Sequence, residues 1–320
     1  MIITNQFGLP ESIMNVIHRP QYDKGDSQIS ATEILNSPRI VNLKRKHWDS
    51  LEQDASEMVW SLFGSAVHHI LQHGKSEHHV VEERIFTEFN GWRISGAIDL
   101  QEFYEDGVIL SDYKVTGAWA VMNEKDDWHK QLNVYAWLLE RVKGVKVKAL
   151  NIVAIIRDWS RRDALTKEGY PKSPIVVIDI PLWDFDKREE YVASRLRLHN
   201  EAFFAIHAGE DMPECTSEEM WERQEFFAVK KQGNVRAKSV HETQKAAEEA
   251  VAKAMEKAKK GESFFIEHRP GSRVRCEGFC QVAPHCSQYA LYKSGNSGVQ
   301  FPHEGATNGK TDTDVPQQHS

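Results

Sequence analysis

The sequence has no long apolar run, no excess of positive charge and few cysteines. No stretch approaches the about 20 consecutive apolar residues that cross a bilayer as a helix. The first residues, MIITNQFGLPES, lack the basic and apolar blocks of a secretory signal. These absences predict a cytoplasmic protein with no membrane partner. In a reducing compartment its four cysteines are expected to be thiols or metal ligands rather than disulfides.

Charge excludes a uniformly basic nucleic-acid-binding chain. The 320 residues include 40 Lys and Arg against 47 Asp and Glu, for a formal net charge of −7. Any contact with DNA must therefore come from a local patch. The length suits one large domain, or a domain with a smaller appendage.

Two turn signals divide residues 80–114 into a predicted antiparallel meander of three strands. Asn90-Gly91 and Asp106-Gly107 each separate runs of β-prone residues, and such dipeptides favour tight hairpins because both turn residues need positive φ. Apolar residues at helical spacing predict a helix at 54–74, before the meander.

Helices and strands also alternate after the meander. The predicted elements are a helix at 126–142 ended by Gly144, strands at 145–156 and 174–181, and a long helix at 186–208. Together with the meander, this order predicts a core of the α/β or α+β class.

The character of the sequence changes near residue 211. A hairpin near Gly233-Asn234, a charged helix at 242–260 and a compact cysteine-containing stretch follow. We therefore expect three parts: a core over 1–210, a small module over 211–292 and a disordered tail over 293–320, whose composition is rich in Gly, Ser, Asn, Thr, Asp and Pro.

Counting residues across the two turns brings polar side chains to one face of the meander. With a two-residue loop at each turn, Asp99 is opposite Lys114, and Asp112 shares the face of Lys114. The same count puts Glu82 opposite Asp99. A bulge would shift either register.

Two carboxylates and a lysine on one sheet face suit metal-dependent hydrolysis. Carboxylates bind a hard divalent cation, which clamps a phosphate and acidifies a water. A lysine orients that water and stabilises charge on the phosphorus oxygens. The alternative is a solvated sheet face with a cross-strand Asp–Lys pair, since such triplets are common.

The order and spacing of these residues and of their neighbours resemble the active-site motifs of the PD-(D/E)XK nuclease superfamily, in its RecB-like branch. The matching residues, in the family's order, are Gly64-x-x-x-His68, Gly96-Ala-Ile-Asp99, Asp112-Tyr-Lys114 and Gln131-x-x-x-Tyr135. The resemblance covers roughly residues 30–160, and the cysteine pattern extends it to the C-terminus. Ile98 stands where the superfamily's name has Pro, a departure that the RecB-like branch tolerates.

The resemblance implies a restriction-endonuclease-like core, with a central mixed sheet flanked by helices and a small C-terminal cysteine-cluster module. It implies that His68, Asp99 and Asp112 hold Mg²⁺ or Mn²⁺, with the backbone carbonyl of Tyr113 as a further ligand. His69, beside His68, is the alternative histidine.

The resemblance makes Lys114 the catalytic lysine. Gln131 and Tyr135, one helical turn apart, would face the site and support the DNA or the lysine. Taken alone, these two residues are as well explained by packing and solvation. Glu82 is added to the site because the register count places it opposite Asp99. The alternative is that Glu82 is an exposed side chain on a solvated strand.

The last three of the four cysteines form C-x3-C-x5-C, and the full set is Cys215, Cys276, Cys280 and Cys286. Four thiolates can hold a [4Fe-4S] cluster or a tetrahedral Zn²⁺. The pattern is similar to RecB-like nucleases, CRISPR-associated exonucleases among them, in which three C-terminal cysteines join a distant one. That distant cysteine precedes the core there, whereas Cys215 follows it. The resemblance favours iron–sulfur over zinc.

Two alternatives to this ligand set stay open. His285 or His268 can replace Cys215 as the fourth ligand, and four unrelated buried thiols would hold no metal. Candidate residues for DNA contact are Arg157, Trp159, Arg161 and Arg162 in RDWSRR, the cluster Lys230, Lys231, Arg236 and Lys238, and Arg269, Arg273 and Arg275. A solvated loop with one packed Trp explains the first group equally well, and an ordinary charged hairpin explains the second better.

These inferences together predict a metal-dependent DNA exonuclease that hydrolyses phosphodiester bonds. The resemblance to phage-encoded relatives implies a role in phage or host DNA recombination or repair, on single strands or duplex ends, with a recombination or single-strand-annealing protein as partner. A DNA endonuclease of the same fold, and a non-catalytic DNA-binding scaffold with a zinc-stapled module, are the alternatives.

Overall fold

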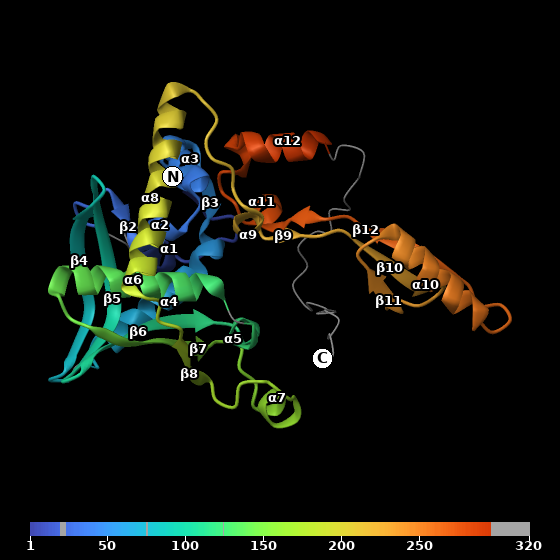
Figure 1. Cartoon of the computed structure of the whole chain (residues 1–320), viewed down its shortest axis with the longest axis horizontal. Coiled ribbons are helices and arrows are strands. Elements are labelled where there is room, and N and C mark those ends of the chain that lie inside the picture. Colours follow the sequence, from blue (N-terminus) through green and yellow to red (C-terminus); the bar gives the residue numbers. More distant parts are fainter. Residues whose placement is uncertain (20–23, 75, 124, 296–320) are drawn as a thin grey trace.

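The computed structural model describes residues 1–19, 24–74, 76–123 and 125–295. Its centre is a six-stranded mixed sheet with the order β2-β5-β6-β7-β8, in which β4 also pairs with β5 (Figure 1). The strands of this sheet are β2 (Ile29–Ser30), β4 (His79–Phe89), β5 (Trp92–Tyr104), β6 (Gly107–Thr116), β7 (Val147–Ile156) and β8 (Ile175–Ile180). The predicted meander and the two later strands are confirmed.

The β4–β5 hairpin confirms the register predicted for the first turn. Asn90 and Gly91 have φ values of 49° and 78°, the conformation that a two-residue turn of the primed type requires. Glu82 and Asp99 therefore lie level with each other. The pairs on either side are Val81–Leu100 and Glu83–Ile98.

The register predicted for the second hairpin is wrong by two residues. Gly107 pairs with Tyr104, so the two-residue loop is Glu105-Asp106. Gly107 is needed for a close approach rather than for the tip of the turn. Its φ is +144°, and a Cβ on it would lie 2.7 Å from the carbonyl oxygen of Lys146.

This shift changes partners but not faces. Continuing the observed register places Asp112, and not Lys114, level with Asp99. Because side chains alternate with a period of two, a slip of two residues returns each side chain to its original face. The predicted gathering of Asp99, Asp112 and Lys114 on one face therefore survives.

Helix α6 (Asp126–Lys143) packs across the sheet and ends at Gly144, whose φ of +65° closes the helix in the left-handed conformation as predicted. Its inward face is fully buried at Leu132, Trp137 and Leu138, and each such side chain contributes about 1.5–3 kcal/mol by leaving water. The helix connects β6 to β7, which run parallel. It thereby sits over the strands that carry the acidic residues.

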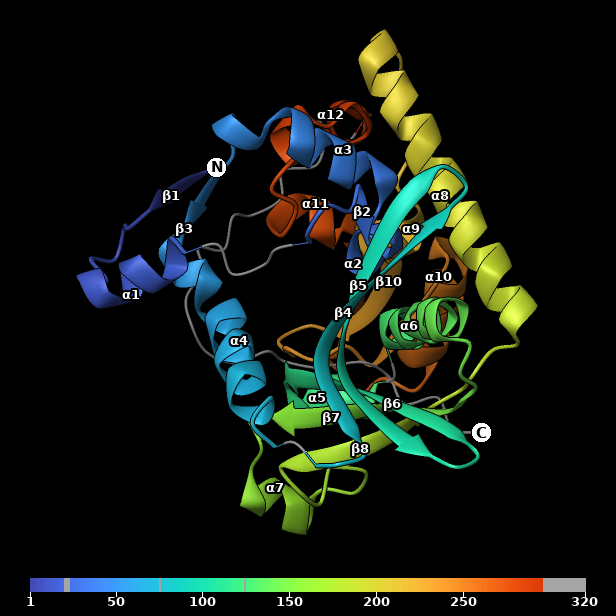
Figure 2. The same ribbon diagram turned by 90° about the vertical axis from the view of Figure 1, so that its left-hand side faces the viewer.

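Other helices cover α6 and flank the sheet (Figure 2). The long α8 (Phe185–Ala208) packs against α6, α2 (Ala31–Leu35) and α3 (Pro38–Lys46). The remaining elements of this part are β1 (Ile2–Thr4), α1 (Glu11–Ile17), β3 (Glu52–Asp54), α5 (Ala118–Met122) and α7 (Arg161–Thr166), with 3-10 turns at Trp48–Ser50 and Ala55–Met58.

Helix α4 (Val59–Leu71) contacts β6, and in the view of Figure 2 the strands β4 and β5 are seen between it and α6. It confirms the helix predicted at 54–74. None of its residues is buried, however, and Trp60, Phe63 and Ile70 are 55%, 43% and 67% exposed. The apolar periodicity predicted the helix correctly but not the covering of its apolar face.

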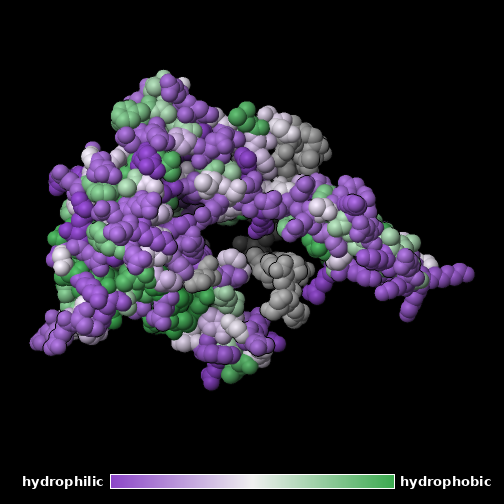
Figure 3. All heavy atoms as spheres, viewed as in Figure 1, coloured by the Kyte–Doolittle hydropathy of each residue, from purple (hydrophilic) through white to green (hydrophobic). Residues whose placement is uncertain are grey.

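The C-terminal part forms an arm that projects from the rest of the molecule, with a largely hydrophilic surface (Figures 1 and 3). In the arm, α10 packs on the antiparallel sheet β11-β10-β12, and β9–β13 pairing forms its base. The elements are α9 (Ser217–Met220), β9 (Glu222–Arg223), β10 (Phe226–Lys231), β11 (Ser239–His241), α10 (Gln244–Glu256), β12 (Phe264–Arg269), β13 (Ser272–Arg273), α11 (Val274–Gly278), a 3-10 turn at Ala283–His285 and α12 (Ser287–Gly295).

The arm confirms the hairpin predicted near Gly233-Asn234 and the charged helix predicted at 242–260. Helix α12 continues to Gly295, and the rest of the predicted tail, residues 296–320, lies outside the described residues. No helix in the described part of the chain combines the length and apolar character that a bilayer crossing requires.

Candidate active site

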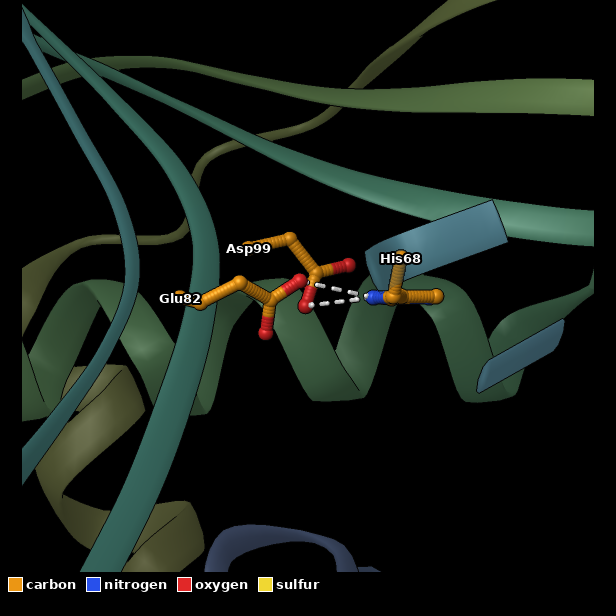
Figure 4. Close-up of side chains that lie close together, drawn as sticks. All are labelled: His68, Glu82 and Asp99. Atoms are coloured by element: carbon orange, nitrogen blue, oxygen red, sulfur yellow. Dashed lines mark hydrogen bonds and ion pairs between the residues drawn. The ribbon is translucent and has the colours of Figure 1, made fainter. Parts of the chain in front are cut away.

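Three side chains from three elements meet in an acidic pocket (Figure 4). His68 of α4 places Nδ1 3.0 Å from Glu82 Oε1 and 3.6 Å from Asp99 Oδ1. One ligand atom from each of the three lies within 4.8 Å of the others. His68, and not the alternative His69, points inward, since His69 contacts Gln72 on its own helix.

The backbone of Tyr113 joins the same pocket. Its amide N–H donates to Asp99 Oδ2 at 2.8 Å, and its carbonyl oxygen lies 3.2 Å from His68 Nε2. Strand β6 therefore presents a main-chain oxygen where β4 and β5 present carboxylates.

A second group of polar side chains lies beside this pocket, on β6 and α6. Lys114 Nζ is 2.7 Å from Asp112 Oδ2 and donates to Gln131 Oε1 at 3.0 Å. Gln131 Nε2 donates to Asp112 Oδ1 at 2.9 Å and to the Tyr135 hydroxyl at 3.2 Å. Gln131 thus fixes both members of the ion pair at once.

The two aspartates of the site are buried. Asp99 and Asp112 are only 7% and 2% exposed. Burial raises the pKa of Asp99, and the charge of Asp112 raises it further. The hydrogen bond with Glu82 raises the pKa of His68. Both shifts reflect carboxylates gathered in a partly buried place.

Two further features of the pocket fit a metal ion. Asp112 Oδ2 is buried and, although close to Lys114, makes no hydrogen bond of good geometry within the described residues. Glu82 has a φ of +51°, an uncommon conformation for a residue with a side chain, and such strain gathers at functional sites. Carboxylates and a carbonyl oxygen suit Mg²⁺ or Mn²⁺.

The four cysteines line one small cavity of about 10 Å³, at the base of the arm. Cys215 is buried there. Its Sγ lies 3.1 Å from Ser37 Oγ, and its backbone N–H and carbonyl both bond to the Gln288 side chain. Burial raises the pKa of Cys215 and of Cys276 to about 11. The position of Cys215 after the core in sequence therefore does not separate it from the other three.

The spacing of the thiols is wider than that of a tetrahedral site. In the described chain, the group His68, Glu82 and Asp99 is the one set of three ligand atoms within 4.8 Å of one another, so no three thiols are that close. Sulfur atoms around a tetrahedral Zn²⁺ lie about 3.8 Å apart, given Zn–S bonds of about 2.3 Å.

The histidines considered as substitute ligands lie elsewhere. His285 stacks on His47, with ring centroids 3.9 Å apart. His268 stacks on Phe227 and pairs with Glu225 at 3.0 Å. Neither lines the cavity of the cysteines.

Most of the predicted DNA-contacting residues are engaged within the protein. Lys230 and Lys231 pair with glutamates at 2.9 and 2.7 Å. Trp159 donates its indole N–H to the Pro171 carbonyl at 2.9 Å, and Arg275 donates to the Glu219 carbonyl at 3.1 Å. Arg157 differs, since its guanidinium lies over the exposed ring of Trp60.

Comparison with known proteins places these features in a family. The sequence profile of the PD-(D/E)XK nuclease superfamily matches residues 31–287, and none of the curated proteins matches the chain. The crystal structure of SSO0001 is similar at 15% identity and a TM-score of 0.40, covering 58% of this chain and 82% of that one. A protein of Eubacterium rectale described as a candidate exonuclease is similar at 13% identity and a TM-score of 0.27, covering 51% and 56%.

The profile match spans most of the chain and includes every element that carries the acidic pocket, and the mixed sheet flanked by helices is the restriction-endonuclease-like arrangement. The chain belongs to the PD-(D/E)XK nuclease superfamily.

Proposed function

We propose that the protein is a Mg²⁺- or Mn²⁺-dependent DNA exonuclease that acts on single strands or duplex ends in phage or host recombination or repair. The superfamily is one of nucleases that hydrolyse phosphodiester bonds. The observation that carries the proposal is the acidic pocket of His68, Glu82 and Asp99 beside the Asp112–Lys114 pair. A scaffold protein would have no need to bury two carboxylates next to a lysine.

His68, Asp99, Asp112 and the Tyr113 carbonyl would hold the cation, with Glu82 as a further ligand. A bound cation would supply charge for the phosphate and a more acidic water. The donor set fits, because His68, Glu82 and Asp99 place ligand atoms within 4.8 Å of one another, the Tyr113 carbonyl lies beside His68, and Asp112 Oδ2 lacks a hydrogen bond of good geometry.

Lys114 performs the step that belongs to the chain itself. Its ammonium can donate to the attacking water and to a phosphate oxygen, which orients the first and stabilises charge on the second. Gln131 accepts from Lys114 and donates to Asp112. The amide therefore holds the lysine at the metal side of the pocket and limits its rotamers before substrate arrives.

End-labelled linear DNA and circular DNA, each single- or double-stranded, test the activity with Mg²⁺ and Mn²⁺. We expect degradation of linear DNA and survival of circles. Lys114→Ala should lose about a hundredfold or more in rate. Lys148→Ala is the matched control, since Lys148 pairs with Asp106 in the β5–β6 turn region and lies away from the pocket. Cleavage of circles would make the protein an endonuclease, and full activity in Lys114→Ala would refute the assigned mechanism.

For the cysteine cavity we propose a structural [4Fe-4S] cluster held by Cys215, Cys276, Cys280 and Cys286. Support comes from the small cavity that all four cysteines share. The present 10 Å³ is about the space of one water, so a cluster must move the thiols apart. Anaerobically purified protein should absorb near about 400 nm and lose this band in Cys215→Ser. Colourless protein with stoichiometric zinc would overturn the assignment.

A further inference from the structure

Trp60 lies on the same face of α4 as His68, two turns nearer to the start of the helix. Eight residues of helix separate them by about 12 Å. Gly64 stands between them on this face, and a Cβ built on it would meet nothing within 4 Å. An open strip of helix surface therefore leads from the acidic pocket to Trp60.

Trp60 presents an aromatic ring to solvent and is held by a cation. The ring is 55% exposed, and the guanidinium carbon of Arg157 lies 4.0 Å from its centroid. Arg157 in turn donates its backbone N–H to the Thr116 carbonyl, at the end of β6 beyond Lys114. The indole and the guanidinium thus form a platform anchored to the catalytic strand.

Beyond Trp60 the surface opens into a groove of about 650 Å³. Its opposite wall is the cysteine-bearing segment 278–282, where Phe279 is 67% exposed. Gln281 donates to Gln53 at 2.6 Å and ties the two walls together. The charged residues of the groove are Lys44, Glu52, Glu57 and Arg275.

We propose that this groove, together with the strip over Gly64, is the path of a single DNA strand, with unpaired bases stacking on Trp60 and Phe279. The inference rests on the proposed nuclease function and names its substrate as single-stranded. Exposed aromatic faces stack on unpaired bases of any sequence, whereas the bases of a duplex are already stacked on one another.

The charge of the groove also selects against a duplex. Its two cations are balanced by two glutamates, and Arg275 is already bonded to Glu219 and Asn36. Duplex binding depends on many cations that neutralise two rows of phosphates. Lys44 and Arg157 suffice only for occasional contacts with the phosphates of one strand.

The dimensions set the length of strand that is needed. The about 12 Å from His68 to Trp60 corresponds to three or four nucleotides at about 3.4 Å each. The groove itself falls within the about 300–1,000 Å³ that encloses a ligand of drug size, and so accepts a further nucleotide or two. Substrates shorter than this should lose the benefit of both aromatic residues.

Fluorescence anisotropy of labelled oligo-dT and of a blunt duplex, without divalent metal, tests the path. Trp60→Ala and Phe279→Leu should each weaken oligo-dT binding about tenfold and leave duplex binding unchanged, while Trp60→Phe should restore most of the affinity. Leucine at 279 keeps the packing against Trp221, whose ring centroid lies 5.4 Å from that of Phe279. Phe204→Ala, at a 62% exposed ring on α8, is the matched control.

Hydrolysis of bis(p-nitrophenyl) phosphate with Mn²⁺ separates the two proposals. This small diester reaches the pocket without the groove, so the Trp60 and Phe279 variants should hydrolyse it at the wild-type rate. No hydrolysis of any DNA or diester by wild-type protein would refute the nuclease function and leave the binding result to decide the path. Unchanged oligo-dT affinity in both variants, or an equal loss for the duplex, would overturn the single-strand path.

Discussion

Gly96 of β5 and Tyr135 of α6 are in direct contact, and the contact leaves no room for a side chain on the glycine. A Cβ built there would lie 2.7 Å from Leu138 Cδ2 and 3.2 Å from two ring carbons of Tyr135. Helix α6, which carries Gln131, therefore sits as near to the sheet as packing allows. The glycine of the Gly96-Ala-Ile-Asp99 motif sets this distance.

Gly96→Ala should push α6 outward and displace Gln131 from Asp112. We expect a loss of about 1–3 kcal/mol in the free energy of unfolding, because overpacking forces the backbone to shift. We also expect the cleavage rate to fall by more than the smaller fraction of folded protein accounts for. Urea denaturation and steady-state cleavage measure the two effects. Gly64→Ala, at an open helical position, is the control and should be stable or gain up to about 1 kcal/mol. Equal stability of the two variants would contradict the packing argument.

Gln131→Ala should lower the cleavage rate by about tenfold to a hundredfold while leaving Mn²⁺ affinity nearly unchanged. The amide positions Lys114 through one hydrogen bond and Asp112 through another, so its loss frees the lysine without removing a metal-facing carboxylate. In a double-mutant cycle with Lys114→Ala, the two losses should not add. Tyr135→Phe removes one hydrogen bond from the amide and should have the smaller effect. Additive losses would show that Gln131 acts independently of the lysine.

The acidic face was predictable because alternation along a strand is insensitive to the error that was made. The second turn was misplaced by one residue, which shifts the pairing register by two, since Asp106-Gly107 resembles a primed turn whereas Gly107 is needed for the close approach of Lys146. An even slip preserves the face. A slip of one residue would have sent Lys114 to the opposite side of the sheet.

Contacts between distant segments were not predictable from local patterns. The family resemblance, and not local spacing, grouped Cys215 with the C-terminal cysteines. In the structure, hydrogen bonds with Gln288 and Ser37 hold it beside them. No pattern in the sequence indicates a function for Trp60, although its position eight residues before His68 places it on the same helix face. Exposure and the partner Arg157, which only the structure gives, distinguish it from a core tryptophan.

Arg39→Met should destabilise the junction between α3 and the cysteine module by about 3 kcal/mol, because it leaves buried oxygen acceptors without a hydrogen-bond donor. Arg39 is 1% exposed and donates to the carbonyls of Met212 and Pro213 and to the side chains of Ser287 and Asp211. Hydrogen exchange should quicken in α12 and in the segment around Cys215 before it changes in α6. Arg45→Met, at an exposed ion pair with Glu33, is the control and should cost at most about 1 kcal/mol. Uniform quickening across the sheet would contradict a local role.

His199 should make the protein less stable as the pH falls from 6.5 towards 4. The side chain is 1% exposed, its Nε2 lies 3.2 Å from the Ile34 carbonyl, and burial lowers its pKa from 6.5 to about 4. Between these pH values the unfolded chain binds a proton that the folded chain does not. The free energy of unfolding therefore falls by up to about 1.4 kcal/mol for each unit by which the pH is lowered. Above pH 6.5 the histidine is neutral in both states and has no effect. His199→Gln keeps a donor for Ile34 but does not titrate. Between pH 7.5 and pH 5.0 the wild type should lose about 2 kcal/mol more than this variant in urea denaturation, and parallel losses would show that His199 is protonated equally in both states.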